Sequence, residues 1–455
     1  MKPETSVVIA KSMLTTKRTY YRWIVLLITI GMYTVSFADR VNMGIVLPVV
    51  RSEFGLTNME AGELASMYFG GYIIAMLPFG FFMGKYGVRG LVGLAIMGFS
   101  MFTYLIGTAG SAAAILWYRI GLGAIESPVP PGGVTVIKSW YPKHEQATAS
   151  GIFSAASTLG QLVVPPIAVW IMLNYGWRYV FYWFAVPGFV LGIIWWIFIR
   201  NRPEQSPFCN VAEQEYINNR EDVAAVDSKT LLAQDSKTTI IRIVDKLVPR
   251  KPVKLIEKTS QVFLSKNIWG VTLGFCFIGF LSIGTVFWIP AFLVDAKGMS
   301  FAKMGWIATA QPLGGCIGCI VGGIISDRLL KNRRKANLLF APLSMLVMMY
   351  LLIHVPNDPY ILYLELLLTG FFLYIAWSCY YSYTMLITTS KTYPIAAALL
   401  VCIGNAGGFF SPTFAGYLLD VYNSYDPVFM FFAASALVSF LCIAMISEPS
   451  KVEGS

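Results

Sequence analysis

The apolar residues of this chain gather into twelve long segments, which polar stretches separate. A helix needs about 20 largely apolar residues to cross the hydrocarbon core of a bilayer, and each segment is long enough to do so. The segments run over residues 22–50, 60–83, 90–109, 112–138, 146–173, 177–200, 268–295, 302–326, 337–355, 359–389, 392–419 and 426–446. The pattern therefore predicts an all-α membrane protein with twelve transmembrane helices.

The composition predicts the same class of protein. Of the 455 residues, 56% are hydrophobic and 13% are charged, and the mean hydropathy is +0.63. Soluble domains carry about 25% charged residues, so a water-soluble enzyme is excluded. No cleavable signal peptide is expected, because the first apolar segment is far longer than the apolar part of such a peptide.

The net charge of +10 is explained by the predicted topology. Most basic loop residues fall on one side of a twelve-helix arrangement, and they are Lys17, Arg18, Arg22, Lys85, Arg89, Lys138, Lys143, Arg328, Lys331, Arg333, Arg334, Lys335 and Lys391. Because basic loops stay on the cytoplasmic side of a membrane, both termini are predicted to be cytoplasmic. The expected macromolecular environment is a lipid bilayer, and no nucleic-acid partner is expected.

A polar stretch, residues 201–266, divides the chain into six apolar segments and six apolar segments. It holds 11 Lys or Arg and 9 Asp or Glu, so we predict a cytoplasmic linker there. Two interpretations of residues 253–263 stay open, a solvated tether and a surface segment on the bilayer. The predicted organisation is a tail at 1–21, a bundle at 22–200, the linker at 201–266, a bundle at 267–446 and a tail at 447–455.

Four ionisable residues lie inside predicted transmembrane segments, and they are Asp39, Arg40, Arg119 and Glu126. A charge in hydrocarbon costs roughly 3 kcal/mol or more, so such groups face a watery cavity, pair with each other or bind an ion. The side chains of Asp39 and Arg40 point about 100° apart on their helix. Arg119 and Glu126 share one helix face about 10 Å apart.

Two acids and two arginines in apolar helices predict a proton-coupled path for an anion. In this hypothesis Asp39 and Glu126 carry protons, and Arg119 holds an acid in one state and releases it in another. A second interpretation stays open, in which Arg119 and Glu126 form an ion pair that only clamps helices together.

Three prolines and two glycines follow Glu126 within residues 128–133. Proline removes a backbone donor and breaks helical regularity, so an interruption is predicted beside this acid. Irregular backbone within a membrane is tolerated only where it is buried in protein or faces a cavity.

The two halves of the chain repeat the same landmarks at a nearly constant offset. Residues 80–85 match residues 323–328 at an offset of 243, with further basic residues after each copy, and residues 160–165 match residues 407–412 at an offset of 247. Such a duplication is typical of transporters built from two repeats. The charged positions of the first pair of motifs include Lys85, Arg89, Asp327 and Arg328.

The duplicated loop motif and the twelve segments resemble the major facilitator superfamily. Within it the chain resembles the anion:cation symporters through the motifs Asp39-Arg40-x-Asn42, Arg119-x-Gly121-x-Gly123-x2-Glu126-x-Pro128, Gly176-Trp177-Arg178 and Gly404-Asn405-x-Gly407-Gly408. That group includes galactonate, glucarate and hexuronate carriers and the eukaryotic sialin-type carriers. The resemblance implies two pseudo-symmetric six-helix bundles and transport by alternating access.

The resemblance also implies a charged latch between helices at the loop motif. This chain has Gly84 where the family usually has Asp. The latch would then depend on Lys85 and Arg89, or on the second copy with Asp327 and Arg328.

The resemblance further implies a set of substrate-binding residues, Arg40, Tyr72, Ser157, Gln161, Trp377, Ser382 and Asn405. Arg40 would bind the substrate carboxylate with support from Tyr72. Ser382 and Asn405 would face the hydroxyl groups of the substrate. Several relatives carry a glutamine where this chain has Ser157, and here a glutamine follows one turn later.

These features predict a secondary transporter of the inner membrane that moves a sugar acid, such as an aldonate, hexuronate or aldarate, together with protons. Two alternatives stay open, proton-independent exchange of organic anions and a membrane sensor with a transporter fold. We expect neither an enzyme nor a cofactor or metal, because no nucleotide loop, metal cluster or Ser–His arrangement is visible. One chain of six plus six segments encloses a complete pathway, so a monomer is expected.

Overall fold

The computed structural model describes the chain except for residues 1–17, 219–244, 247, 331–332, 390–391 and 454–455. The first half contains α2 (Tyr21–Phe54), α3 (Asn58–Tyr86), α4 (Val88–Thr108), α5 (Ala112–Glu126), α6 (Val129–Trp140), α7 (Lys143–Tyr175) and α8 (Trp177–Phe198). The second half contains α13 (Lys266–Asp295), α14 (Phe301–Ile307), α15 (Ala310–Ile324), the π-helix η2 (Ile325–Leu329), α16 (Arg334–His354), α17 (Pro359–Tyr374), α18 (Trp377–Leu386), α19 (Tyr393–Tyr422) and α20 (Asp426–Ala444). The described linker and C-terminal elements are η1 (Pro203–Gln205), α9 (Val211–Asn218), β1 (Arg250–Lys254), α12 (Thr259–Leu264) and β2 (Glu448–Glu453).

The described helices follow the twelve predicted segments. Ten of them, alone or as continuous pairs, are long and apolar enough to cross a membrane. The other two predicted segments are α3 and the pair α5 and α6. The predicted interruption beside Glu126 is confirmed, because α5 ends at this residue and α6 begins at Val129.

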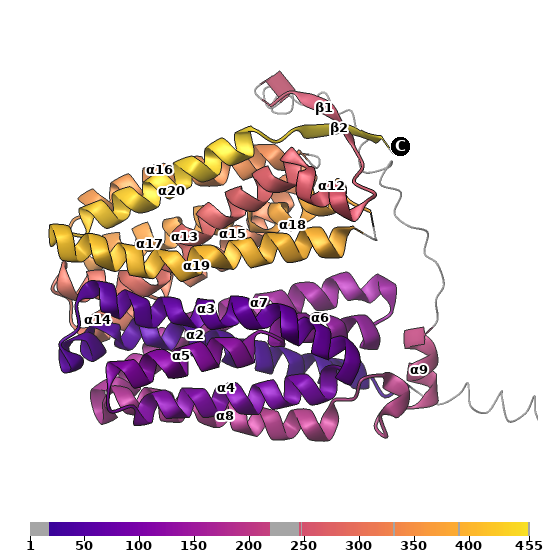
Figure 1. Cartoon of the computed structure of the whole chain (residues 1–455), viewed down its shortest axis with the longest axis horizontal. Helices are drawn as coiled ribbons and strands as arrows, with labels where there is room; N and C mark the ends of the chain where they lie inside the picture. Colours follow the sequence, from indigo (N-terminus) through magenta and orange to yellow (C-terminus); the bar gives the residue numbers. More distant parts are fainter. Residues whose placement is uncertain (1–17, 219–244, 247, 331–332, 390–391, 454–455) are drawn as a thin grey trace, which may run out of the picture.

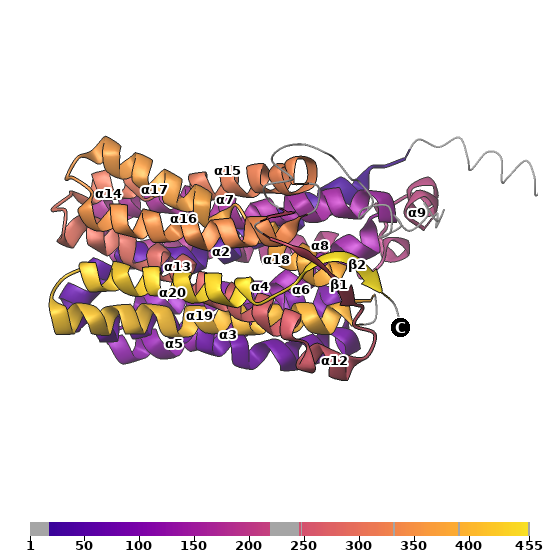
Figure 2. The ribbon, with the colours of Figure 1, turned by 90° about the horizontal axis from the view of Figure 1, so that it is seen from above.

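The helices form two bundles that lie side by side (Figures 1 and 2). Figure 1 shows α2–α8 as one layer and α13–α20 as the other. Both views place α9, α12, β1 and β2 at one end of the bundles, which we call the linker end. The opposite end carries the turns at 55–57, 296–300 and 423–425, and we call it the loop end.

Close contacts between glycine and backbone join α3 to α5 in the first half. A Cβ atom on Gly71 would lie 2.1 Å from the carbonyl oxygen of Ile120, and one on Gly123 would lie 1.9 Å from that of Tyr68. Only glycine permits such an approach of two helix backbones. The two helices therefore pack without side chains between them at these positions.

The same pair of contacts recurs between α15 and α17 in the second half. A Cβ atom on Gly314 would lie 1.9 Å from the carbonyl oxygen of Leu367, and one on Gly370 would lie 1.9 Å from that of Gln311. These residues stand 243 positions after their counterparts in α3 and 247 positions after those in α5. The offsets found in the sequence motifs therefore also relate equivalent packing contacts.

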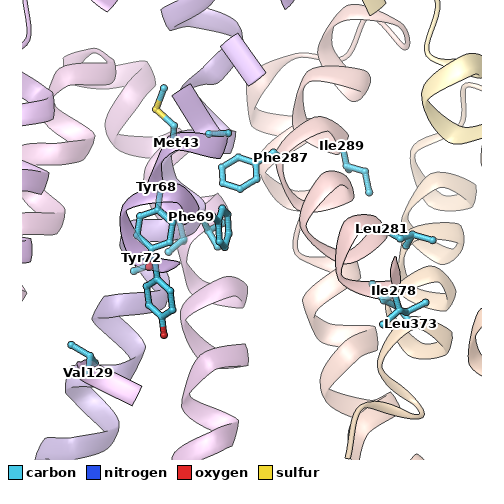
Figure 3. Packing of buried hydrophobic residues seen from close by; sticks show 14 of the residues in the cluster. Met43, Tyr68, Phe69, Tyr72, Val129, Ile278, Leu281, Phe287, Ile289 and Leu373 are labelled. Carbon is cyan, nitrogen blue, oxygen red and sulfur yellow. The ribbon is translucent and has the colours of Figure 1, made fainter. Parts of the chain in front are cut away.

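Polar contacts fasten the two halves together at the loop end. Arg51 of α2 pairs with Asp295 of α13 at 2.8 Å. The carboxylate of Asp420, on α19, accepts the backbone N–H groups of Asn58 at 2.8 Å and Met59 at 2.7 Å, at the start of α3. Deeper in the molecule, Phe69 of α3 and Phe287 of α13 lie edge to face across the two halves, with ring centres 6.5 Å apart (Figure 3). The halves thus meet from the centre of the molecule to the loop end.

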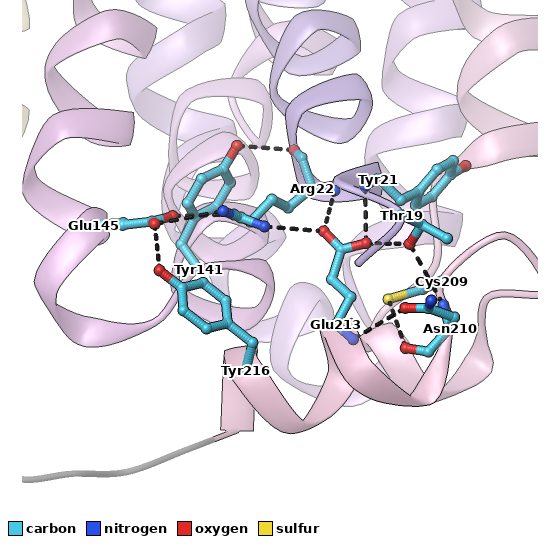
Figure 4. A network of polar contacts seen from close by, with 9 residues as sticks. All are labelled: Thr19, Tyr21, Arg22, Tyr141, Glu145, Cys209, Asn210, Glu213 and Tyr216. Carbon is cyan, nitrogen blue, oxygen red and sulfur yellow. Dashed lines mark hydrogen bonds and ion pairs between the residues drawn. The ribbon is translucent and has the colours of Figure 1, made fainter. Parts of the chain in front are cut away.

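The first part of the linker is docked on the first half (Figure 4). Glu213 of α9 is fully buried and accepts the backbone N–H groups of Tyr21 at 2.8 Å and Arg22 at 3.2 Å, where α2 begins. The Arg22 guanidinium bridges Glu213 at 3.2 Å and Glu145 of α7 at 3.0 Å. The described start of the linker is therefore part of the folded structure and not a solvated tether.

The last part of the linker is docked on the second half. Strand β1 pairs in parallel with β2, and Arg333 binds Asp245 at 2.5 and 2.7 Å. Val253, Ile256 and Val262 are buried inside the protein. These three side chains pack inside the protein, which neither open interpretation of residues 253–263 anticipated, whereas Phe263 is 49% exposed. A contact of this stretch with the bilayer stays a prediction.

The glycine contacts predict that alanine substitutions at two positions of α15 differ in their effect on thermal stability. Gly314→Ala is expected to lower the melting temperature by several degrees, because overpacking costs about 1–3 kcal/mol. Gly323→Ala, on the same helix, is expected to have no such effect, because nothing lies within 4 Å of its Cβ position. Thermal unfolding of the two variants in detergent checks this, and an equal loss in both would contradict it.

Candidate coupling site between α2, α3 and α5

The four ionisable residues of the predicted segments come together where three helices of the first half meet. Asp39 and Arg40 lie on α2, and Arg119 and Glu126 lie on α5. Arg119 and Glu126 are completely buried, Asp39 is 1% exposed, and the side chain of Arg40 is 13% exposed. Arg40 is thus the most accessible charge of the group.

Arg40 is the charge partner of Glu126. Its Nε donates to Oε1 of Glu126 at 2.8 Å, and its Nη2 lies 2.7 Å from the same oxygen. The hydroxyl group of Ser36, one turn earlier on α2, also donates to this oxygen. The guanidinium lies over the rings of Phe37 at 4.4 Å and Tyr72 at 5.2 Å. Aromatic faces therefore flank the ion pair and stabilise the Arg40 cation by cation–π attraction.

Arg119 instead binds backbone oxygens. Its guanidinium donates to the carbonyl oxygens of Leu64 at 3.1 Å, Ala65 at 3.3 Å and Asp39 at 3.4 Å. The predicted role of Arg119 in holding and releasing an acid stays a prediction. In this structure Arg119 does not bond directly to Glu126, so the alternative of an Arg119–Glu126 ion pair differs from this arrangement. The reason is geometric, since the two residues stand two turns apart and carbonyls of α2 and α3 already occupy the guanidinium. Arg119 thereby ties three helices together.

Several buried polar atoms of the site lack a hydrogen-bond partner among the described residues. They are Oδ2 of Asp39, Oδ1 of Asn42, the hydroxyl of Tyr68, Oγ1 of Thr103 and Oε2 of Glu126. Oδ1 of Asp39 has one weak donor, the amide of Asn42 at 3.5 Å. A buried carboxylate without donors is strongly disfavoured, whereas a protonated carboxyl group is far less so. Each acid therefore has one oxygen available for a proton.

The predicted substrate-binding residues lie on helices that face each other across the two halves, and in this structure several of them bind their own helix. Ser157 of α7, Ser382 of α18 and Asn405 of α19 each donate to a carbonyl of the preceding turn, at 2.7, 2.9 and 2.9 Å. Trp377 is half-buried, and its ring lies 4.9 Å from that of Phe275. Their role in binding stays a prediction.

Gln161 and Tyr72 are closer to the contact between the halves. Gln161 of α7 lines a small cavity together with Val41 of α2, Val286 of α13 and Gln311 of α15. Tyr72 is buried on α3 beside the Arg40 guanidinium. These two residues link the charged site to the interface of the two halves.

The charged residues of the loop motif lie at the linker end, away from the buried site. Arg89 donates to the carbonyl oxygen of Trp196 at 2.8 Å and so joins α4 to α8. The Lys85 ammonium is exposed and lies 5.3 Å from the centre of the Tyr86 ring. Asp327 and Arg328 belong to η2, and their side chains lie outside the described residues. A latch at this motif stays a prediction.

Two residues of the site, Ser36 and Tyr68, were missed in the sequence analysis. Ser36 stands four residues before Arg40, and Tyr68 stands four residues before Tyr72. Residues four apart share a helix face, so this spacing was the available signal.

Among the described residues no group of three His, Cys, Asp or Glu side chains is arranged to hold a metal ion.

The contacts of Arg119 predict that even a substitution that keeps its positive charge lowers the stability of the protein. Arg119→Lys keeps the positive charge but loses the planar fork, so we expect a loss of about 1–3 kcal/mol in stability. Arg178→Lys is the matched control, because Arg178 is 37% exposed in its pair with Glu53. Thermal unfolding in detergent distinguishes the two, and equal melting temperatures would contradict the bracing role.

The comparisons with known proteins agree with this architecture. The family model of the Major Facilitator Superfamily matches residues 29–392. A probable galactarate/D-glucarate transporter of Bacillus subtilis (strain 168) is 27% identical over 456 residues, which cover 96% of this chain and 94% of that protein. The D-galactonate transporter of Escherichia coli O6:H1 (strain CFT073) is 26% identical over 449 residues, which cover 96% and 97%.

A solved structure shares the fold. It is that of a bacterial homologue of the human lysosomal transporter Spinster in an inward-facing and occupied conformation, with a TM-score of 0.66 and 17% identity over 94% of each chain. The expected fold is therefore confirmed, and the chain belongs to the major facilitator superfamily, a family of multi-pass membrane transporters.

Proposed function

We propose that this protein moves a sugar acid across the membrane together with protons. The observation that carries the proposal is the Arg40–Glu126 pair, in which a partly accessible guanidinium is held by one oxygen of a fully buried acid. The second oxygen of that acid has no hydrogen-bond partner among the described residues. Both features suit a pair that opens when another carboxylate arrives.

The pair links anion binding to proton binding. A substrate carboxylate offers Arg40 two parallel hydrogen bonds and so competes with Glu126 for the guanidinium. Once Arg40 turns to the substrate, Glu126 is left as a buried acid without its cation. Leaving an uncompensated charge there costs about 3–5 kcal/mol, so Glu126 takes up a proton. An entering anion therefore recruits a proton.

Asp39 supplies a second proton site in this proposal. Its neighbour Arg119 binds the backbone carbonyl of Asp39, so it does not neutralise the carboxylate by a direct bond. Asp39 is 1% exposed, and its carboxyl group has only weak donors, the amide of Asn42 at 3.5 Å and the nearby hydroxyl of Thr103. Burial of this kind favours the protonated form, and access of water from one side of the membrane would allow the proton to leave.

The proposed substrates are sugar acids of the aldonate, hexuronate or aldarate class, and relatives named as galactarate/D-glucarate and D-galactonate transporters support the aldarate and aldonate classes. Such molecules carry a carboxylate at one end and a row of hydroxyl groups. Arg40 would bind the carboxylate. Tyr72, beside the Arg40 guanidinium, would support it. The polar groups Ser157, Gln161, Ser382 and Asn405 would bind the hydroxyl groups, with Trp377 stacking on the carbon chain.

The polar contacts at the loop end describe one state of an alternating-access cycle. The proposal assigns the linker end and both termini to the cytoplasm of an inner membrane, following the basic loops. The bundles at 22–200 and 267–446 would rock about the buried site as two rigid bodies. A single chain suffices for this cycle.

Purified protein in liposomes with a trapped pH dye tests the function. Addition of one compound from a panel of hexonates, hexarates and hexuronates is expected to acidify the interior, and a protonophore is expected to abolish that signal. Glu126→Gln and Asp39→Asn should each lower gradient-driven uptake at least about tenfold and preserve exchange of labelled substrate. Uphill uptake that survives the double substitution would sink the proposal.

Glu365→Gln is the control for this experiment. Glu365 is a buried acid of α17, bonded to Thr369 at 3.4 Å and belonging to the other half. It should retain gradient-driven uptake. Labelled substrate that crosses without any change of internal pH would favour exchange, and binding without flux would favour a sensor.

A further inference from the structure

Tyr68 occupies a central place among the charged residues. It lies on α3, is completely buried, and its ring is close to both arginines. The guanidinium carbon of Arg40 lies 5.4 Å from the ring centre, and that of Arg119 lies 5.1 Å from it. Both separations are within the range of cation–π attraction. The ring therefore stabilises two cations that repel each other.

The backbone of Tyr68 is fixed in place. Its carbonyl oxygen lies so near Gly123 of α5 that a Cβ atom there would come within 1.9 Å. Arg119 binds the carbonyl oxygens of Leu64 and Ala65, one turn earlier on the same helix. Tyr68 thus keeps its position whether or not Arg40 stays in its present place.

The hydroxyl group of Tyr68 is buried without a hydrogen-bond partner among the described residues, as is Oε2 of Glu126. Glu126 is one of the groups that interact with the Tyr68 hydroxyl, and the Arg40 guanidinium lies between the Tyr68 ring and Oε1 of Glu126. A buried hydroxyl without a partner costs about 1–3 kcal/mol, so a hydrogen bond from this group to a neighbouring carboxyl group is favourable. A phenol donates to a carboxylate and accepts from a carboxylic acid.

We propose that Tyr68 is the positioning residue for the coupling proton, and that its hydroxyl binds the protonated carboxyl group of Glu126 when Arg40 turns to the substrate. This inference rests on the proposed function. In the present state Oε1 of Glu126 already has two partners, Ser36 and Arg40. In this proposal the hydroxyl of Tyr68 therefore stabilises the protonated carboxyl group of Glu126 after Arg40 has moved away from it.

Other titratable and charged groups face this carboxyl group from the surrounding helices. They are Tyr33, Asp39 and Arg40 of α2, Tyr72 of α3 and Arg119 of α5. None of them changes in a Tyr68→Phe variant, which keeps the ring and its contacts with both arginines. The substitution thus isolates the hydroxyl group.

The first measurement is the pH dependence of gradient-driven uptake in liposomes. Tyr68→Phe removes a hydrogen bond from the protonated state, so the pH of half-maximal uptake is expected to fall by about half to one unit. Tyr380→Phe is the matched control, because its hydroxyl is also buried without a partner among the described residues but belongs to α18 in the other half. An unchanged midpoint in Tyr68→Phe overturns the proposal.

The second measurement needs no substrate and separates this proposal from the function as a whole. An Arg40→Met background leaves Glu126 without its cation and so imitates the substrate-bound state. In that background the melting temperature of the Tyr68→Phe variant in detergent should fall further below that of its parent as the pH decreases. When Glu126→Gln is added, that pH-dependent difference should vanish. A loss that is equal at every pH would show a purely structural role and overturn the proposal. Absence of proton-driven uptake by the unaltered protein would refute the proposed function, while the melting series would still decide the role of Tyr68.

Discussion

The need to compensate charges inside a membrane shapes the first half of this protein. A buried guanidinium must be surrounded by acceptors, because an uncompensated charge costs several kcal/mol. Arg119 meets that need with three backbone carbonyls, one on α2 and two on α3, and it reaches those of α3 because α3 and α5 approach each other at Gly71 and Gly123. Close glycine packing and a buried arginine are thus two parts of one arrangement.

The second half keeps this packing without the charges. Its glycine contacts between α15 and α17 reproduce those between α3 and α5. The positions 247 residues after Arg119 and Glu126 are Leu366 and Leu373, both fully or almost fully buried. The two repeats therefore share the glycine packing but differ in the charged residues that the packing surrounds. In the proposed mechanism the first half handles charge, and the second half contributes neutral polar and aromatic groups.

The linker is fixed to both bundles by its ends. Glu213 caps the start of α2, the helix that carries Asp39 and Arg40, and β1 pairs with β2 beyond the last helix. A carboxylate that accepts the first N–H groups of a helix stabilises it through hydrogen bonds and the helix dipole. The position of the charged part of α2 thus depends partly on a contact outside the membrane region.

The sequence by itself determined the number of membrane segments, the repeat and the identity of the charged residues, because hydrophobic length and the cost of buried charge act locally along the chain. Resemblance in a few motifs was enough to indicate the superfamily. The sequence did not determine the partners of those charges. It left an ion pair between Arg119 and Glu126 open, whereas the structure pairs Glu126 with Arg40, and it missed Ser36 and Tyr68. Which side chains meet depends on how three helices are rotated and how closely they approach, and only the tertiary structure decides that.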